Sequence, residues 1–295
     1  MTAPMSARFV KQVGTPFDER IVAVAGRGRS LLLQLRSGER LVDALARAFE
    51  EAGFLGGVVD VGGLELDHFS YVMPALSKDG ANAAFYSDVY QPEGVIVLES
   101  GRMSFGRRDE APFFHCHALW PEPDGQCHGG HILPDHVRLA FDQSVHAYGF
   151  DGGVFEANPD RETNFKLFGP VPAPSRHQDD AQMQVCRLLR LRPNQDLHGA
   201  LEAYCAAHGF GPTRILGGVG STIAGRFEDG TILEPFATEV YIREGNVSCL
   251  EDGSYQAHID VGYIDYTGQI ARGPIMRGDS PVLMTFELML CPGLA

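Results

Sequence analysis

Long apolar runs are missing from this 295-residue sequence. None approaches the roughly 18–20 residues that a helix needs to span a bilayer. Residues 1–20 also lack an apolar core followed by a small-residue cleavage site, the mark of a secretory leader. The six cysteines are scattered too widely for a disulfide framework, and we expect most of them to be reduced and buried. These absences favour a soluble cytoplasmic protein without a membrane partner.

Basic residues are scarce as well. The sequence has 24 Lys and Arg against 38 Asp and Glu, a net charge of −14. A protein that grips the phosphate backbone of nucleic acid gathers basic side chains on one face, so the overall charge opposes DNA binding. Residues 1–40 are a local exception with seven basic and three acidic residues. We interpret them as an ordinary solvated face.

What remains is the composition of a globular protein. Hydrophobic residues make up 44% and charged residues 21% of the chain, close to the averages of folded domains. This composition excludes a disordered tail, a collagen-like repeat and a coiled coil. Because most domains have about 100–200 residues, the chain is long enough for two.

A repeated pattern divides the chain into two halves. Residues 32–41, LLQLRSGERL, recur 156 positions later as LLRLRPNQDL, and Gly53-Phe54 recurs as Gly209-Phe210. Farther along, residues 115–117 (HCH) align with residues 258–260 (HID) at a spacing of 143. Since the spacing falls from 156 to 143, the first half carries about thirteen extra residues, which we place in the loop-like stretch 77–92.

The repeat predicts two homologous domains, at residues 20–155 and 183–293. Residues 156–182 between them are rich in Pro, Asp and Asn, which predicts an extended linker. In the first unit we expect a strand over 30–35 and a helix over 39–52 that ends at Gly53. Further β-prone runs cover 58–61, 94–98 and 113–119, with counterparts at 214–216, 238–243 and 255–261. The predicted fold class is α/β (α+β), with a mainly antiparallel sheet packed against a helix in each domain.

The most specific signal is a histidine-rich hairpin at residues 114–131, where two β-prone arms flank a Pro-Asp-Gly turn. With the turn centred on Pro123, His115 lies across from His131 and His117 lies across from Gly129. Side chains alternate along a strand, so the three histidines share one face, with opposed Cβ atoms about 5 Å apart. Three imidazoles then converge on one point.

Three histidines with an open fourth position are typical of a functional site for zinc or a similar divalent ion. The alternative is an ordinary half-exposed strand that carries His-x-His, but three histidines on one face favour the metal. Gly129 has no side chain and leaves room for the ion and its waters. Cys127 falls on the histidine face as an accessory ligand, whereas His128 and Cys116 point to the other face.

The second half has a matching hairpin with different side chains. Centred on Tyr266, it places His258 opposite Pro274 and puts Asp260 at the position of His117. One histidine remains of three. We therefore expect the second domain to keep the fold and to lack the metal site.

The repeat and the hairpin together resemble the PPC domain (plants and prokaryotes conserved), in two tandem copies. The resemblance rests on LLLQLRSGERLVDALARAF at 31–49 and FHCHALWPEPDGQCHGGHILPDHVRLA at 114–140, and it covers most of both halves, the second less completely. It implies an α/β domain with an antiparallel sheet, a homotrimer, a histidine-bound metal in prokaryotic members and DNA binding in plant members. The sequence departs from the family pattern at Ile132, which follows Gly-Gly-His, at Cys127 and His128, which replace apolar residues, and in the second copy.

Three functions fit the sequence. The leading one is a metal-binding oligomer whose first domain binds a small polar or anionic ligand at the ion, with regulation as its output. A metal-dependent hydrolase or lyase would use the same site with an acid or base such as Asp109, Glu110 or Asp124. DNA binding would need a minor-groove segment like the Arg-Gly-Arg-Pro of plant members. Here residues 27–29 (RGR) precede Ser30, and we interpret them as the turn into the first strand.

Two assemblies are compatible with a duplicated chain. Two unequal repeats stack as two layers of a trimer, or they pack against each other as a pseudo-symmetric pair within one chain. The resemblance favours the trimer, and the residues themselves leave both open.

Overall fold

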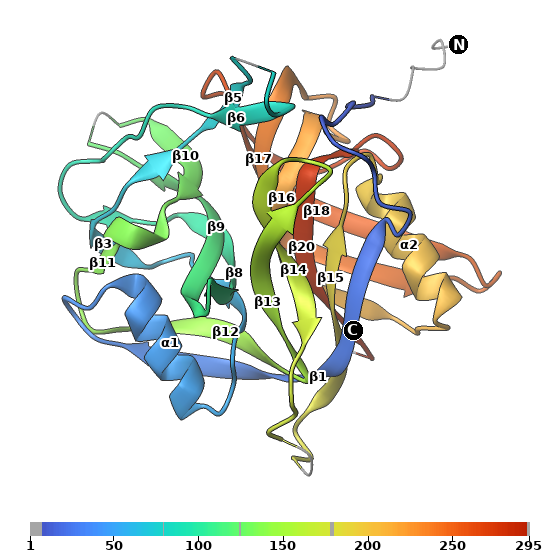
Figure 1. Ribbon diagram of the computed structural model, residues 1–295, viewed down its shortest axis with the longest axis horizontal. Coiled ribbons are helices and arrows are strands. Elements are labelled where there is room, and N and C mark those ends of the chain that lie inside the picture. Colours follow the sequence, from blue (N-terminus) through green and yellow to red (C-terminus); the bar gives the residue numbers. More distant parts are fainter. Residues whose placement is uncertain (1–7, 79, 124, 178–179, 294–295) are drawn as a thin grey trace.

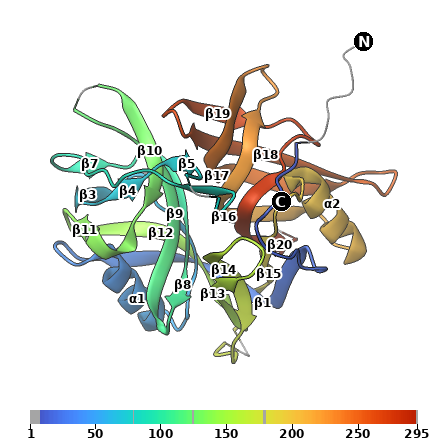
Figure 2. The same ribbon diagram turned by 45° about the horizontal axis from the view of Figure 1, so that its top comes forward.

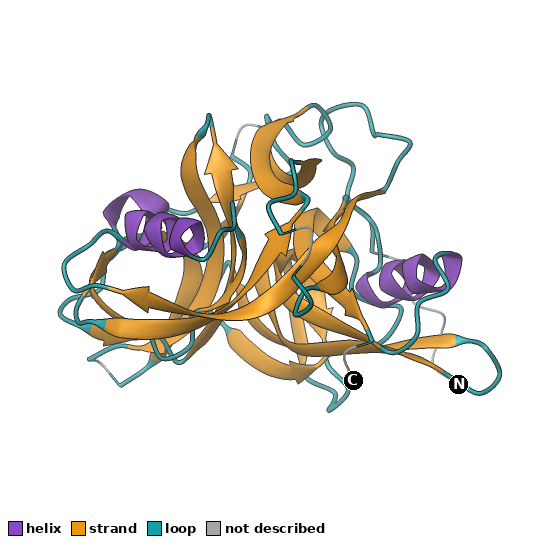
Figure 3. Ribbon diagram, turned by 90° about the horizontal axis from the view of Figure 1, so that it is seen from below, coloured by secondary structure: helices purple, strands orange, loops and turns teal. Residues whose placement is uncertain are grey.

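The computed structural model describes residues 8–78, 80–123, 125–177 and 180–293 of the chain. Most of it is antiparallel β-sheet with two α-helices (Figure 1, Figure 3), so the predicted α+β class is confirmed. Its first part contains β1 (Ile21–Leu35), α1 (Leu41–Glu51), β2 (Gly57–Asp60), β3 (Glu65–His68), β4 (Tyr71–Val72), β5 (Pro74–Leu76), β6 (Ala84–Tyr86), β7 (Ile96–Val97), β8 (Ser100–Arg108), β9 (Ala111–Pro121), β10 (Cys127–Ile132), a 3₁₀ turn (Pro134–His136), β11 (Arg138–Leu139) and β12 (Gln143–Asp151). Then follow β13 (Gly153–Asp160), β14 (Phe165–Pro172), β15 (Gln184–Leu191), α2 (Leu197–Ala207), β16 (Thr213–Arg226), β17 (Ile232–Cys249), β18 (Tyr255–Asp265), β19 (Ile270–Pro274) and β20 (Val282–Pro292).

One large sheet has β1 and β15 at its centre, paired antiparallel. Outward from β1 the order is β12-β2-β8-β9-β10, and outward from β15 it is β20-β16-β17-β18-β19. The strand that precedes each helix therefore pairs with the last long strand of its own half. Two small sheets, β11-β3-β7 and β5-β6, belong to the first half. The long strand β1 pairs with β12 at one end and with β15 at the other, so it joins the two lobes that Figure 2 shows.

The helices form where apolar residues recur at helical spacing. Helix α1 buries one face in the first core, through Leu41, Val42, Ala44, Leu45, Ala48 and Phe49. Just beyond α1, Gly53 has φ of +86°, a conformation that glycine adopts without strain. Helix α2 begins at a side-chain cap, because Oδ2 of Asp196 accepts a hydrogen bond of 2.8 Å from the backbone N–H of Gly199.

Each half has its own apolar core, and a third apolar cluster lies between them. Strands β16 and β17 of the second half lie against β8 and β9 of the first. The third cluster contains a disulfide that joins Cys186 on β15 to Cys291 on β20. Among the four free cysteines, Cys116 and Cys205 are buried. Neither helix in the described part of the chain is long and apolar enough to cross a membrane.

Two segments that we expected to be irregular contain strands. Within 156–182, residues of β13 and β14 pair as an antiparallel hairpin, and β13 also runs parallel to β8. Phe155 and Phe168 of this hairpin are buried between the halves, and burying them stabilises the hairpin against the rest of the protein. Residues 156–172 are therefore not an extended linker. The stretch 77–92 contains β6, which pairs with β5.

Candidate metal centre

Three histidine side chains come together on β9 and β10. His115 and His117 lie two residues apart on β9 and His131 lies on β10, so all three point to one face. Nε2 of His115 and Nε2 of His117 are 3.0 Å apart, and Nε2 of His117 is 3.3 Å from Nδ1 of His131. The ligand atoms lie within 4.8 Å of one another, and no other cluster of His, Cys, Asp or Glu in the described ranges has spacing suited to a metal ion.

The pairing that we predicted across the hairpin is wrong by two residues. His131 lies opposite His117 rather than His115, and Gly129 lies opposite Leu119 rather than His117. A side chain at Gly129 would meet Leu119, whose Cδ2 would be 2.3 Å from the added Cβ, so this glycine makes room for a leucine and not for an ion. An even shift leaves every side chain on its predicted face. For that reason the three histidines still meet.

The turn explains the shift. The backbone N–H of Glu122 donates to the carbonyl of Gln126 at 3.0 Å, which closes the turn one residue later than a centre on Pro123 requires. Gly125 has φ of +80° and takes the left-handed conformation inside the turn. The ladder therefore begins after Gly125.

The pairing that we predicted for the hairpin of the second half is wrong by the same two residues. Asp260 lies opposite Pro274, in the relation that His117 has to His131, whereas we had placed His258 there. Nη1 of Arg243 donates to the Asp260 carboxylate at 3.1 Å, and His258 is exposed. Among the described residues no candidate metal cluster forms in this half.

The other histidine-hairpin residues lie outside the cluster. Sγ of Cys127 accepts a hydrogen bond of 3.0 Å from Nη2 of Arg272 and lies 3.7 Å from the Glu99 carboxylate. It is not part of the histidine group, so the accessory-ligand prediction is wrong. Cys116 packs in the first core and His128 lies 3.8 Å from the Glu122 carboxylate, and neither joins the group.

Two carboxylates from the second half complete the surroundings of the histidines, and neither was among the site residues that we predicted. Oε2 of Glu287, on β20, is 2.6 Å from Nδ1 of His115, and Oε2 of Glu239, on β17, is 2.8 Å from Nε2 of His117. Both glutamates are buried. A signal was present, because Glu287 is the single charged residue in the apolar run 281–292 (PVLMTFELMLCP). A lone acid in such a strand indicates a buried carboxylate with a partner.

Burial and neighbouring charges set the protonation of the site. Burial, together with the charge of His117, lowers the pKa of His115 to about 3 and holds the pKa of His131 well below its usual value. Burial raises the pKa of Glu287 to about 8. Burial alone would also lower the pKa of His117, but the charge of Glu239 and its hydrogen bond raise it further than burial lowers it. His115 and His131 are therefore neutral imidazoles, whereas Glu239 favours a positive charge at His117.

The orientation of the rings fits a divalent cation. Nδ1 of His117 donates to the carbonyl of Val240 at 3.0 Å, and Nδ1 of His115 is held by Glu287. The Nε2 atoms of both rings then point toward each other and toward His131. Without a metal ion, Nε2 of His117 shares a proton with Oε2 of Glu239, 2.8 Å away, and a bound cation would take the place of that proton. A second ring nitrogen held by a carbonyl or a carboxylate is the usual support of a metal-binding histidine.

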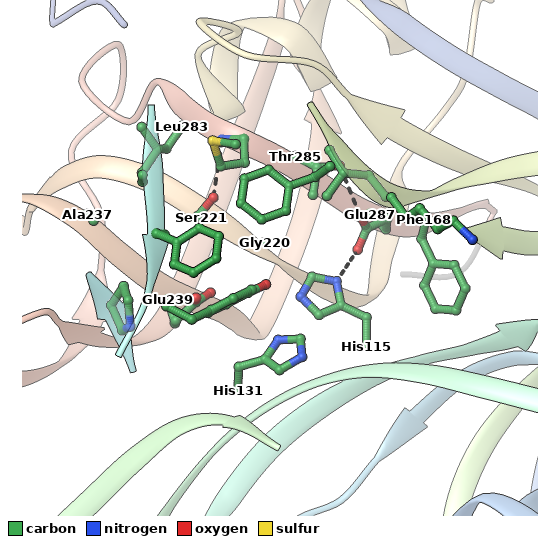
Figure 4. Close-up of a pocket in the computed structure, with 18 of the residues that line it drawn as sticks. His115, His131, Phe168, Gly220, Ser221, Ala237, Glu239, Leu283, Thr285 and Glu287 are labelled. Atoms are coloured by element: carbon green, nitrogen blue, oxygen red, sulfur yellow. Dashed lines mark hydrogen bonds and ion pairs between the residues drawn. The ribbon is translucent and has the colours of Figure 1, made fainter. Parts of the chain in front are cut away.

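A cavity of about 80 Å³ adjoins the histidines. Figure 4 shows His115 and His131 on one side of it and Glu239 and Glu287 close by. Most of the remaining wall is apolar. Its aromatic members are Phe85, Tyr86, Phe113, Phe165 and Phe168.

Two of the three acids that we named as partners of a catalytic metal lie away from the histidines. Asp109 and Glu110 form the exposed turn between β8 and β9, and Asp109 pairs with Nζ of Lys166 at 2.8 Å. Asp124 lies outside the described residues. The prediction is wrong for the first two, and the carboxylates beside the cluster are Glu239 and Glu287 instead.

The Arg-Gly-Arg segment is part of a strand. Residues 27–29 lie inside β1, not in a turn that enters it. Nη2 of Arg27 donates to the carbonyl of Met183 at 2.8 Å, and the guanidinium of Arg29 is 3.6 Å from the Asp180 carboxylate. Both arginines are thus packed against the segment that precedes β15.

No family model and no curated protein matches the sequence. Several solved structures are similar to part of it. A plant- and prokaryote-conserved (PPC) protein from Pyrococcus horikoshii has 19% identity and a TM-score of 0.39, over 50% of this chain and 96% of its own. A metal-containing protein from Archaeoglobus fulgidus has 23% identity and a TM-score of 0.37, over 48% and 94%. A possible DNA-binding protein from Ralstonia eutropha JMP134 has 15% identity and a TM-score of 0.37, over 48% and 90%.

Proposed function

We propose that this chain is a tandem PPC-domain protein that binds one divalent ion, zinc, through His115, His117 and His131. A small polar or anionic ligand is received at the ion. The observation that carries the proposal is the orientation of the rings. Glu287 and Val240 hold Nδ1 of His115 and Nδ1 of His117, so the Nε2 atoms of the two rings converge. Three imidazoles with space beside them suit a zinc site that keeps a position for a ligand.

The two halves contribute differently to this site. All three imidazoles come from the first half, whereas Glu239, Val240 and Glu287 come from the second. We interpret the halves, residues 20–155 and 183–293, as homologous domains on the basis of the sequence repeat and of their common strand order. One copy then keeps the ligands and the other supplies their supports.

A metal-dependent hydrolase or lyase is the second candidate. It is favoured by Glu239, whose buried carboxylate lines the cavity 2.8 Å from Nε2 of His117. Such a group can hold or move a proton next to a ligand. When bound, the ion would supply a positive charge that polarises an oxygen of the substrate. Turnover of ester, amide or lyase substrates by the metal-loaded protein, lost in Glu239→Gln, would favour the enzyme.

DNA binding has little support in the molecule. The net charge is −14, and Arg27 and Arg29 are engaged with the protein itself. Phosphate contacts would make affinity fall steeply with salt. We expect no shift of duplex DNA in electrophoresis even at low salt, and a salt-sensitive shift would contradict this.

A homotrimer is proposed on the family resemblance alone. Light scattering should then give three times the chain mass of 32.1 kDa. A monomer mass at micromolar concentration would contradict the trimer and favour packing of the two repeats within one chain.

Elemental analysis tests the metal site. We expect about one divalent ion per chain in the purified protein, and loss of the ion in the triple variant His115→Ala, His117→Ala, His131→Ala. His128→Ala is the matched control, since it removes an imidazole from the same hairpin outside the cluster. Circular dichroism would verify that each variant is folded. A triple variant that keeps its ion, or a stoichiometry near two, would contradict the proposal.

A further inference from the structure

The cavity beside the histidines has a polar end and an aromatic body. His115, His131, Glu239 and Glu287 line the polar end. The rest of the wall is mainly apolar, with Ser221, Thr238 and Lys166 as polar members, and the ammonium of Lys166 pairs with Asp109. Its aromatic side chains are Phe85, Tyr86, Phe113, Phe165 and Phe168. The rings lie at the separations of favourable aromatic contacts: Phe85 and Phe165 have centroids 6.1 Å apart and Phe113 and Phe168 are 5.8 Å apart. A ligand in this cavity meets charge at one end and rings along its length.

The aromatic wall comes in part from the extra residues of the first half. Strands β5 and β6 form a two-stranded flap, and β5 lies against β17 of the second half. Phe85 and Tyr86 are on this flap, and the Tyr86 ring lies 5.3 Å from that of His131. Figure 1 shows the flap beside β16 and β17, over the region where the halves meet. Phe85 and Tyr86 of this extra stretch therefore belong to the cavity wall.

Size narrows the ligand class. Pockets for drug-sized ligands are about 300–1,000 Å³, whereas this cavity has about 80 Å³. A cavity of this size favours a small ligand over a nucleotide or a peptide. A single ring or a short branched chain with one head group fits this volume.

We propose that the cavity binds a small monocarboxylate with an aromatic or branched aliphatic body, its carboxylate toward the histidines and its body among the phenylalanines. This inference rests on the proposed metal site, because the ion supplies the positive charge that attracts the carboxylate past Glu239 and Glu287. Apolar walls strengthen that attraction by excluding water. Burial of the body supplies the remaining affinity.

Calorimetric titration of the zinc-loaded protein with benzoate tests the proposal. Acetate carries the head without the body, benzyl alcohol carries the body without the charge, and benzyltrimethylammonium carries the body with the opposite charge. We expect benzoate to bind about 10- to 100-fold more tightly than acetate, as burial of a ring predicts, and more tightly than the other two probes. Removal of zinc with a chelator should weaken the binding of benzoate at least about tenfold. If benzyltrimethylammonium bound more tightly than benzoate, the proposal would be overturned, because the aromatic wall would then bind a cation.

A pair of variants on the flap localises the ligand. Phe85 is 52% exposed and lines the cavity, whereas Leu76 on the paired strand is 47% exposed and lies outside the cavity lining. Phe85→Ala should weaken the binding of benzoate by about fivefold to tenfold without changing the zinc content. Leu76→Ala should change neither the affinity for benzoate nor the zinc content. Equal effects of the two variants would overturn the placement.

Failure of this inference is distinguishable from failure of the metal site. A protein that holds one zinc ion but binds benzoate no better than acetate overturns the ligand class alone. A protein without bound zinc overturns the metal proposal on which it rests. Benzoate that binds the zinc-free protein with full affinity overturns the placement of the carboxylate.

Discussion

Nδ1 of His115 lies 2.6 Å from Oε2 of Glu287, although 172 residues separate them in the chain. The contact joins β9 of the first half to β20 of the second. On its other side, Glu287 accepts a hydrogen bond of 2.9 Å from the hydroxyl of Thr285, which in turn accepts one of 3.1 Å from Nε of Arg190. Arg190 is bound to Asp160 at 2.7 Å. A continuous buried network thus runs from the candidate metal centre through β20 and β15 of the second half to β13.

Glu287→Gln should weaken zinc binding. With zinc bound, the positive charge of the ion would favour the ionised form of Glu287. This carboxylate fixes the His115 ring and increases the basicity of Nε2, and loss of such a support typically costs about 10- to 100-fold in metal affinity. Competition with a chromophoric chelator would measure the dissociation constant. Glu244→Gln, an exposed acid on β17, is the control and should leave it unchanged. An unaltered dissociation constant in folded Glu287→Gln would show that the carboxylate does not support the ligand.

Asp160→Asn should destabilise the fold. Its Oδ2 lies 2.7 Å from Nη2 of Arg190 and 2.8 Å from Nη1 of Arg192, and all three side chains are buried. Loss of the negative charge leaves two buried guanidinium groups without their counter-ion, which costs about 3–5 kcal/mol of unfolding free energy. Urea denaturation measures it. Asp109→Asn, which removes an exposed partner of Lys166, should unfold at the same urea concentration as the parent protein.

Acid should remove the contribution of Asp160. Burial would raise the pKa of this carboxyl, but the charges of Arg190 and Arg192 and the hydrogen bond from Thr163 hold it below the usual 3.8. A lowered pKa stabilises the fold above the unfolded-state value, and the contribution is lost as the pH falls through the folded-state value. The difference in urea midpoint between the parent and Asp160→Asn should therefore be full at pH 7 and shrink below about pH 3.8. A difference that does not change with pH would contradict the ion-pair explanation.

A thiol titration should find four free cysteines in the unfolded, unreduced chain, because Cys186 and Cys291 are joined and the remaining four are free. The disulfide closes a separation of 105 residues. The double variant Cys186→Ala, Cys291→Ala should lose about 2–4 kcal/mol of unfolding free energy. A titre of six in protein purified without reductant would show that the pair is reduced.

Local patterns sufficed for the helices and for the faces of the strands. The helix expected over 39–52 is α1, Leu41–Glu51, because apolar residues at a period of 3.6 specify one buried face and Gly53 permits the left-handed turn that follows. The grouping of His115, His117 and His131 depended only on the alternation of side chains along a strand. Alternation is unchanged by an even shift in pairing, so the histidines met although the register was wrong.

Long-range contacts lay beyond what a local pattern contains. The register of the histidine hairpin depends on where Gly125 takes the left-handed conformation within the turn. The strands within 156–172 form because Phe155 and Phe168 are buried between the halves. Glu239 and Glu287 reach the histidines only because the second half packs against the first. The sequence by itself therefore determined the elements, the shared face and the three imidazoles. The tertiary structure decided their register, their acidic supports and the aromatic cavity, since these depend on free energy gained between segments far apart in the chain.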